Sequence, residues 1–456
     1  MTLRQSPSGT HCRWISTLTI VVLLLIVSIG NILAQGPVNQ VKQNDAEDLL
    51  GNMEQFDLLE EKGSKFELRG LYKNMFMFQR VKNYYEANLY PRGSKNLATD
   101  LNRLRLSPEF RYAKNLVVHI DYDNEVIFSN YNKTKQFDSY WRPSGYNDFL
   151  QMNWDLAYRK EIYYRMKIHR AFAKMTLGDL TVTAGRQQIR FGSGRLWNPL
   201  DILNPVSPTF IEGAEDQKGT DAVKIDYFFD EKTELSLVYN PKRYNDDFNR
   251  LSPCHANSAV RFKTTIINFE IALLAGYISK RITGGTDITA TVFDGLLRGS
   301  IVYARPDEGD TYIQAGAGYE YTFRNGVYFL MEYFYNENGL NYNGVMKNYF
   351  LESVVRGVDQ SNYTRLSNQL ITFNQHYAGL ALGYDFHPLL RGELFTIYDF
   401  QGRGIFWTIS LKYNMRQNTD LNAGLMMSEI FGDQESSDFT TIHRQYIYFL
   451  SLVHYF

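Results

Sequence analysis

The sequence predicts an all-β fold, namely a transmembrane up-and-down antiparallel β-barrel of 16 to 18 strands, with 18 preferred. Three observations lead to this prediction. First, the 456 residues include 33 Tyr and 30 Phe although mean hydropathy is negative, as expected for a wall with one lipid-facing and one polar face. Second, many segments alternate apolar and polar residues with period two. Third, the connections between these segments alternate in length.

The period-two alternation is clearest at residues 311–323. One face carries Ile313, Ala315, Ala317, Tyr319, Tyr321 and Phe323, and the other carries Gln314, Gly316, Gly318 and Glu320. Residues 221–229 and 404–414 show the same pattern. Such segments run for about 9 to 14 residues, which suits a tilted membrane strand and exceeds the ~5–6 residues of a typical soluble strand.

Eighteen candidate strands follow one another along the chain. They begin near residues 67, 101, 115, 162, 180, 221, 233, 258, 268, 284, 295, 311, 326, 376, 388, 404, 418 and 443. Short connections at 113–115, 177–179, 230–232, 324–326, 386–388 and 416–418 are separated by long ones at 80–100, 129–160, 191–219, 241–257, 337–375 and 429–442. Strict alternation indicates periplasmic turns and extracellular loops. The sequence indicates the connections near 267 and 293 only weakly, so a barrel of 16 strands remains an alternative.

A soluble β-sandwich or β-propeller is the main alternative fold. Those folds have shorter strands, no turn/loop alternation and no need for continuous apolar rows such as the one in 311–323. The membrane barrel is therefore the preferred interpretation.

The chain divides into three parts. Residues 1–34 combine Arg4 and Arg13 with an apolar run that ends at Ala34, which predicts a secretory signal peptide; an uncleaved membrane anchor is the alternative. Residues 35–66 form a periplasmic leader with one possible amphipathic helix, and residues 67–456 form the barrel. Cys254 is then the only cysteine of the mature chain, which excludes an intrachain disulfide.

The last strand ends on a terminal aromatic residue, Phe456. Counting back in twos gives His454, Leu452, Leu450, Tyr448 and Tyr446. An alternating strand that closes on a terminal Phe resembles the assembly signal of bacterial outer-membrane barrels, so we expect the barrel-assembly machinery to be a partner through this strand.

The stretch "GRQQIRFGSGRLWNPLDILNP" (185–205) contains a Gly-x-Gly pattern. A phosphate-binding glycine loop requires a following helix, and the prolines after residue 198 exclude one. In the strand before it, the row of residues that is apolar up to Ala184 becomes polar after Gly185, which predicts a β-bulge there or a strand that leaves the membrane. We expect an in-folded loop that narrows a channel; a surface loop is the alternative. The predicted constriction residues are Gly192, Gly194, Trp197, Asn198, Pro199, Asn204 and Pro205.

Basic residues gather on the predicted lumen face of the first half of the barrel. They are Arg103, Arg105, Arg111, Arg165, Lys167, Arg186, Arg190, Arg195, Arg261 and Lys263. Arginines lining a pore form an electrostatic filter that favours anions. Alternatively, these side chains pair with inward carboxylates, and the lumen is packed with structural ion pairs.

At "GRQQIRFGSGRL" the chain resembles the alginate-export-type family of outer-membrane porins. The resemblance implies an 18-stranded barrel with an arginine-rich lumen that passes an anionic polysaccharide. Residue by residue it points to Arg186, Gln187, Arg190, Gly192, Gly194 and Arg195. It implies a channel of this kind, with no particular substrate.

Catalytic motifs are not evident in the sequence. The eight histidines show no His-x-x-x-His spacing, and Gly-x-Ser-x-Gly does not occur. His119 and His169 are the strongest candidates for a base, but a lone lumen histidine is more typical of a polar network. We therefore expect no enzyme, cofactor or metal site. A receptor with a plug domain is also disfavoured, because only about 30 residues lie between Gln35 and the first strand, whereas such a domain needs over a hundred.

The sequence thus predicts an integral protein of the cell outer membrane that acts as a passive diffusion channel for hydrophilic, anionic solutes. The alternative is a structural or adhesin-like barrel with a closed lumen. The expected partners are outer-membrane lipid and a hydrophilic solute; net charge −1 and the lack of a basic run give no indication of nucleic-acid binding.

Overall fold

The computed structural model describes residues 64–80, 96–133, 149–203, 219–241, 256–307, 310–337, 339, 372, 374–432, 437–439 and 443–456. The predicted signal peptide and nearly all of the predicted leader lie outside these residues. The described elements are β1 (Ser64–Arg80), β2 (Asn96–Tyr112), β3 (Leu116–Ser129), the short 3-10 helix η1 (Asn130–Lys133), β4 (Asn153–Tyr158), β5 (Ile162–Leu177), β6 (Leu180–Gln187), β7 (Thr220–Phe228), β8 (Thr233–Asn240), β9 (Asn257–Ile266), β10 (Phe269–Tyr277), β11 (Arg281–Val292), β12 (Gly295–Pro306), β13 (Tyr312–Thr322), β14 (Tyr328–Asn336), β15 (His376–His387), β16 (Leu390–Asp399), β17 (Gly404–Arg416), β18 (Thr419–Ile430) and β19 (Tyr446–Tyr455).

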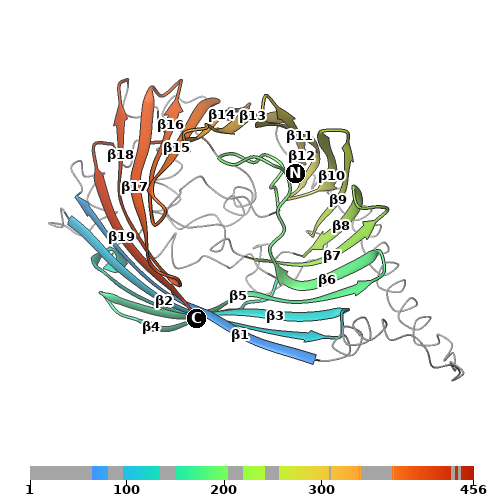
Figure 1. The fold of residues 1–456 in the computed structure, drawn as a ribbon, viewed down its shortest axis with the longest axis horizontal. Helices are drawn as coiled ribbons and strands as arrows, with labels where there is room; N and C mark the ends of the chain where they lie inside the picture. Colours follow the sequence, from blue (N-terminus) through green and yellow to red (C-terminus); the bar gives the residue numbers. More distant parts are fainter. Residues whose placement is uncertain are drawn as a thin grey trace, which may run out of the picture.

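Eighteen of these strands close into one antiparallel barrel (Figure 1). Each strand pairs with the next, β3 pairs with β5, and β1 pairs with β19 to complete the ring. The predicted fold class is confirmed at 18 strands. The additional strand β4, which the alternation did not indicate, pairs along β5 residues 163–167, where β6 no longer does.

The two weak connections are genuine turns, so the 16-stranded alternative is wrong. The β9–β10 turn places Ile267 at φ 56°, and the β11–β12 turn places Phe293 and Asp294 at φ 49° and 60°. Two successive positive φ values are typical of the type I′ turn, whose twist matches that of a hairpin. The predicted strict length alternation fails at 278–280, 307–311 and 400–403, because these connections at the long-loop end are also short.

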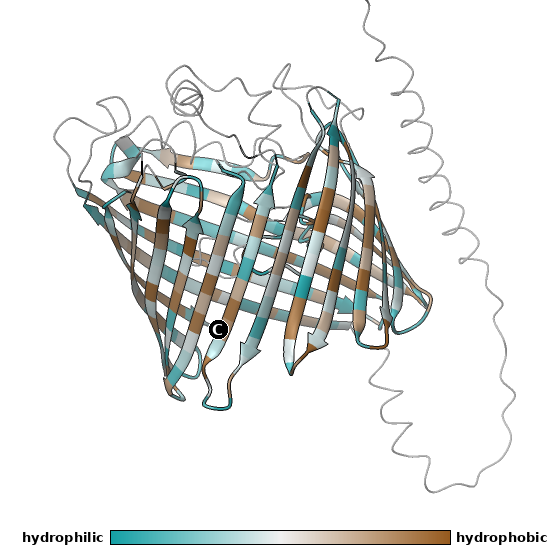
Figure 2. Cartoon of the chain, turned by 90° about the horizontal axis from the view of Figure 1, so that it is seen from above, coloured by the Kyte–Doolittle hydropathy of each residue, from teal (hydrophilic) through white to brown (hydrophobic). Residues whose placement is uncertain are grey.

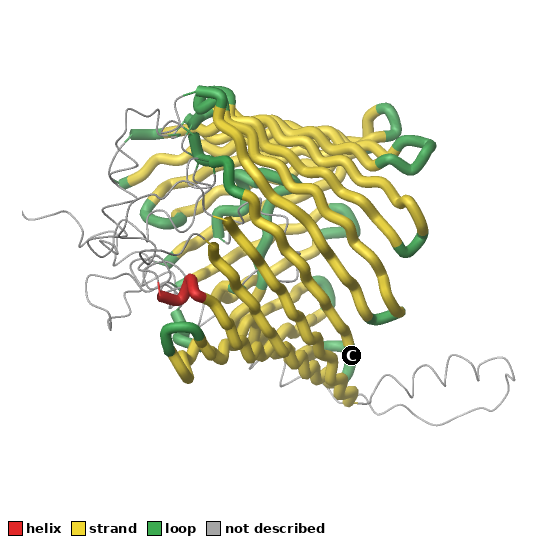
Figure 3. The backbone as a smooth tube through the Cα atoms, turned by 90° about the vertical axis from the view of Figure 1, so that its left-hand side faces the viewer, coloured by secondary structure: helices red, strands yellow, loops and turns green. Residues whose placement is uncertain are grey.

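The outer wall is apolar and the inner wall polar. Outward side chains such as Leu297, Ile301, Ile409 and Leu411 are 43–48% exposed, and the hydropathy colours alternate along each strand (Figure 2). Aromatic pairs flank this surface near both ends of the strands: Tyr321–Phe323 and Tyr384–Phe386 beside the short turns, and Tyr398–Phe400 at the other end. The tilted strands in Figure 3 complete the picture of a transmembrane barrel.

In the described part of the chain, no helix is long and apolar enough to cross a membrane.

The ring closes where the two ends of the barrel domain meet. The amide of Gly70 donates to the carbonyl of Phe456 at 2.8 Å, and the amide of Phe456 donates back at 3.0 Å. A Cβ on Gly70 would lie 2.5 Å from the Phe456 ring and 2.9 Å from the carbonyl oxygen of Arg105. Gly70 therefore makes room for the terminal ring. Recognition of Phe456 by an assembly partner stays a prediction.

Gly70→Ala should destabilise closure by about 1–3 kcal/mol, because the methyl group overlaps both a ring and a backbone oxygen. The measurement is urea unfolding of the protein refolded in lipid vesicles. Gly299→Ala is the matched control, since a Cβ on Gly299 meets no atom within 4 Å. Equal midpoints for the two variants would contradict this account of Gly70.

Candidate functional site

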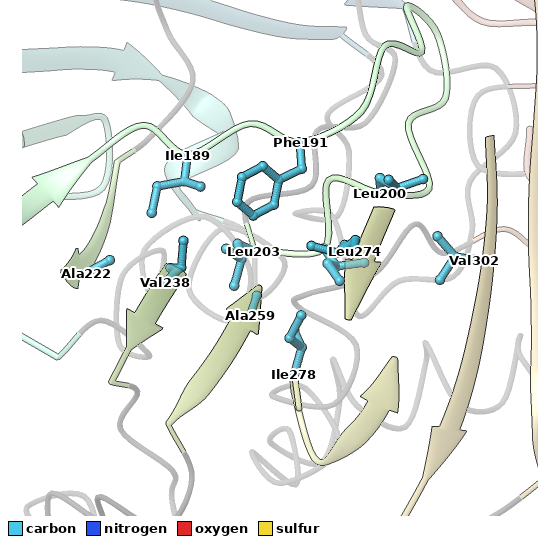
Figure 4. Close-up of a cluster of buried hydrophobic side chains, with 11 residues drawn as sticks. Ile189, Phe191, Leu200, Leu203, Ala222, Val238, Ala259, Leu274, Ile278 and Val302 are labelled. Carbon is cyan, nitrogen blue, oxygen red and sulfur yellow. The ribbon is translucent and has the colours of Figure 1, made fainter. Parts of the chain in front are cut away.

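The chain leaves the wall after β6, and residues 188–203 run inside the ring (Figure 1). We call this segment the inner loop. Its apolar side chains pack on inward side chains of the neighbouring wall (Figure 4). The cluster joins Ile189, Phe191, Leu200, Ile202 and Leu203 of the loop to Ala222, Val238, Ala259, Leu274, Ile278 and Val302. Apolar residues at lumen-facing positions of β7 to β12 thus give the loop a surface on which to bury itself.

The tip of the inner loop reaches the far part of the wall, β14 to β16. Trp197, only 4% exposed, stacks on Phe334 with ring centroids 5.6 Å apart and an interplanar angle of 8°. It also contacts Tyr377 at 6.2 Å, and Leu196 joins the same cluster. Offset aromatic pairs of this kind stabilise by about 0.5–1.5 kcal/mol beyond area burial. The loop is therefore held at both ends of its path.

Two carboxylates of the wall hold the loop backbone. Glu332 of β14 accepts hydrogen bonds from the amides of Arg195, Leu196 and Trp197 at 2.7, 2.8 and 3.1 Å. Asp287 of β11 accepts from the amide and the hydroxyl of Ser193 at 3.1 and 2.8 Å. Charge-assisted hydrogen bonds are about twice as strong as neutral ones. These contacts fix the loop to the inner face of the wall at β11 and β14.

The Gly-x-Gly pattern is required by the tight path of the loop. Gly192 has φ +80°, and a Cβ on Gly194 would lie 2.0 Å from the carbonyl oxygen of Trp197. Asn198 donates from Nδ2 to the carbonyl of Phe191 at 2.6 Å, which closes the turn, and Pro199 is buried. Asn204 and Pro205 lie outside the described residues.

The inner loop carries two exposed cations. The guanidinium of Arg190 donates to the carbonyl of Gly194 at 3.0 Å and, among the described residues, contacts no carboxylate. The side chain of Arg195 is 52% exposed and lies 3.3 Å from Glu320. Glu320 is shared with Arg298 at 2.8 Å, so this pair of arginines faces one carboxylate.

Four other predicted cations form a buried ion-pair network on β2, β3 and β5. Arg105 makes a bidentate contact with Asp123 at 2.6 and 2.8 Å. Glu125 lies 2.7 Å from both Arg103 and Lys167 and also pairs with Arg165. Both carboxylates are fully buried. Here the structure favours the alternative of paired charges over a freely exposed filter.

The remaining predicted cations are also paired. Arg186 is fully buried and binds Asp221 through two contacts of 2.8 and 3.0 Å. The other pairs are Arg261–Glu234 at 2.5 Å, Lys263–Glu270 at 2.7 Å and Arg111–Glu109 at 2.6 Å. The predicted lumen exposure of Arg186 is therefore wrong, because its partner and the carbonyls of Leu150 and Ile168 enclose it.

The predicted bulge at Gly185 is also wrong. Gly185 pairs in register with Phe172 of β5 and Ala222 of β7, without a shift. Its φ of +121° places the residue against the backbone of Ala171, where a Cβ would meet the carbonyl oxygen at 2.3 Å. β6 then ends at Gln187 and the chain turns into the lumen.

The two candidate histidines belong to the polar wall. His119 contacts Glu109 and Asp121, each at 3.0 Å. His169 is 3% exposed and lies 4.0 Å from Asp123, opposite the register shift between β3 and β5.

Glu332 and Asp287 were not singled out as site residues by the sequence. They lie about 95 to 135 residues away from the loop they hold, so no local spacing connects them. One signal was available. Each carboxylate lies in an inward-facing row, and the residue opposite it on the neighbouring strand is not basic.

Solved structures with the same fold are outer-membrane porins of the Occ/OprD type. OccAB4 of Acinetobacter baumannii matches with 11% identity and a TM-score of 0.52, covering 86% of this chain and 98% of that chain. OccK2 (OpdF) and OprD of Pseudomonas aeruginosa match with 7% and 9% identity and TM-scores of 0.52 and 0.51, covering 86% of this chain and 99% and 95% of theirs. No family model and no curated protein matches the sequence. These likenesses establish the 18-stranded barrel fold.

Glu125→Gln should lower the free energy of unfolding by about 3–5 kcal/mol, because it leaves three cations with side chains only 5–17% exposed facing a neutral side chain. The measurement is the urea midpoint in lipid vesicles. Glu270→Gln serves as control: its carboxylate is 40% exposed, and loss of such a pair costs at most about 1 kcal/mol. A similar loss in both variants would count against the buried network as a stabilising element.

Proposed function

We propose that this protein is an outer-membrane channel for the passive diffusion of small or oligomeric hydrophilic solutes, with a preference for anions. The observation that carries the proposal is the inner loop, which is fastened to the inner wall by Glu332 and Asp287 and presents Arg190 and Arg195. The fold shared with the Occ/OprD porins supports a channel.

The proposed mechanism is size exclusion at the inner loop combined with charge selection. A loop that packs through Leu200 on the wall up to β12 and through Trp197 on β14 and β15 sets a fixed aperture. Arg190 adds a positive charge with no carboxylate contact in the described residues, and the Arg195–Arg298–Glu320 group adds a surplus of cations over anions. A passing anion is attracted by both.

The resemblance of residues 185–196 to alginate-export-type porins is consistent with an anionic solute. We propose that Arg190 and Arg195 are the selectivity residues of that stretch, and that Arg186 has a structural role because it is enclosed. We further propose delivery to the outer membrane through the segment 1–34 and assembly through the strand that ends at Phe456.

The second candidate function is a structural barrel with a closed lumen. The observation that favours it is the extensive pairing of the inward charges on β2, β3 and β5. A planar-bilayer recording under a salt gradient separates the two. Discrete conductance steps with an anion-selective reversal potential support the channel; a folded, heat-modifiable protein that gives no steps supports the closed barrel.

Arg190→Ala should shift the reversal potential toward cations. A unit positive charge about 4 Å away in water attracts a passing anion and repels a passing cation by about 1 kcal/mol each, so the anion-to-cation permeability ratio should fall by up to about thirtyfold. Arg324→Ala, at an exposed turn beside β13, is the control for a general change of net charge. Identical shifts in both variants would show that Arg190 does not act locally.

Glu332→Ala should free the loop tip, because three backbone amides lose their acceptor. The expected result is a larger and noisier single-channel conductance with an intact barrel. Glu393→Ala is the matched control: this carboxylate also lies on the inner wall but pairs with Arg391 and Lys412 and not with the loop. Unchanged conductance in Glu332→Ala would contradict the proposed aperture.

A further inference from the structure

The outward face of β1 to β3 interrupts the apolar surface of the barrel. On β13 and β17, by contrast, the outward rows are apolar or aromatic (Ile313, Ala315, Ala317, Tyr319 and Tyr321; Ile405, Trp407, Ile409, Leu411 and Tyr413). On β1 to β3, the rows that include the exposed Phe76, Leu104 and Phe128 also include four polar residues. They are Asn74, Asp100, Asn102 and Asn124, and we call them the polar patch.

The polar patch is hydrogen-bonded within itself. Asn74 donates to Asp100 at 2.6 Å and to Asn102 at 3.1 Å, and Asn102 donates to Asp100 at 3.2 Å. The hydroxyls of Tyr72, Tyr122 and Tyr164 donate to the carbonyl oxygens of these asparagines. These hydrogen bonds hold the side chains of the polar patch in defined positions on the outer surface.

Asn74, Asn102 and Asn124 lie within the depth of the lipid belt, and Asp100 lies at its upper edge. Asn102 is eight residues above the outward aromatic Phe110 on β2. With a rise of ~3.3 Å per residue and a tilt of ~40°, that places it about 20 Å above the lower aromatic level, inside a belt about 25 Å tall. Phe76 and Phe128 flank Asp100 in register and lie at the upper level.

Some groups of the patch are left without partners. Among the described residues, Nδ2 of Asn124 donates to no acceptor and Oδ1 of Asn74 accepts no hydrogen bond, whereas Asp100 accepts from Asn74 and Asn102. Hydrocarbon cannot satisfy these groups, and each costs free energy there. A protein surface can supply the hydrogen-bonding partners that lipid cannot.

We propose that a second copy of this chain covers the polar patch, so that the protein forms a two-fold dimer through β1 to β3. An isologous interface requires one patch that is complementary to itself. The polar patch meets this requirement, because a free amide donor on Asn124 and a free amide acceptor on Asn74 lie on the same surface. The exposed rings and aliphatic chains of Tyr72, Phe76, Leu104 and Phe128 frame it with apolar contact area.

The test measures self-association of the full-length mature protein in phosphatidylcholine vesicles by single-molecule photobleaching, at increasing protein-to-lipid ratios. The wild type should show two bleaching steps. Leu104→Trp keeps the hydrogen-bond network and its lipid compatibility but blocks close approach, so it should weaken dimerisation by at least roughly tenfold. Leu297→Trp is the matched control on β12, where the side chain is also outward and 44% exposed; it should dimerise like the wild type.

Asn124→Leu is the second variant, because it removes the free donor itself and should also weaken dimerisation. Heat modifiability on gels confirms that each variant is folded. A wild type that bleaches in one step at every ratio would overturn the proposal, as would equal dimerisation of Leu104→Trp and Leu297→Trp. Either result leaves the proposed channel intact, since single-channel conductance is measured separately on each species.

Discussion

A sheet that stands in hydrocarbon cannot leave a strand edge unpaired, because lipid offers no partner to backbone amides and carbonyls. The pairing of β1 with β19 meets this constraint, and the rest of the molecule depends on it. It brings residues near 70 and the terminal Phe456 together, and it fixes which face of every strand points outward. Once the ring is closed, period-two alternation in the sequence becomes an apolar exterior and a polar interior.

The interior of the barrel is subject to a second constraint. An 18-stranded ring is too wide for wall side chains to fill alone, and its inward charges need partners. On β2, β3 and β5 they pair across neighbouring strands, as in Arg105–Asp123. The inner wall from β7 to β12 also carries apolar residues such as Val238 and Leu274, and the inner loop packs on them. The lumen is thus divided into a charged side and a side occupied by the loop, and the exposed Arg190 and Arg195 belong to the loop.

Much of the fold was predictable because its determinants are local. Alternation located all 18 barrel strands to within a few residues, including the hairpins at Ile267 and Phe293 that carried the weakest signal. The strand β4 was missed, because it exists only where β6 leaves an edge of β5 to be covered. The prediction of a bulge at Gly185 was wrong for a related reason. The alternation of apolar and polar residues changes there because β6 is about to leave the barrel wall, and no extra residue is inserted in the strand.

The sequence by itself determined the fold class, limited the strand number to 16 to 18 and indicated most of the inward residues, because each of these follows from a period of two and from turn chemistry. Only the tertiary structure decided which inward charges are paired and which are exposed. Arg186 and Arg190 are four residues apart and chemically alike, yet one is enclosed by Asp221 and the other is exposed. The partners come from other strands, and the contact between Glu332 and the loop spans about 135 residues, a distance over which no sequence pattern specifies a hydrogen bond.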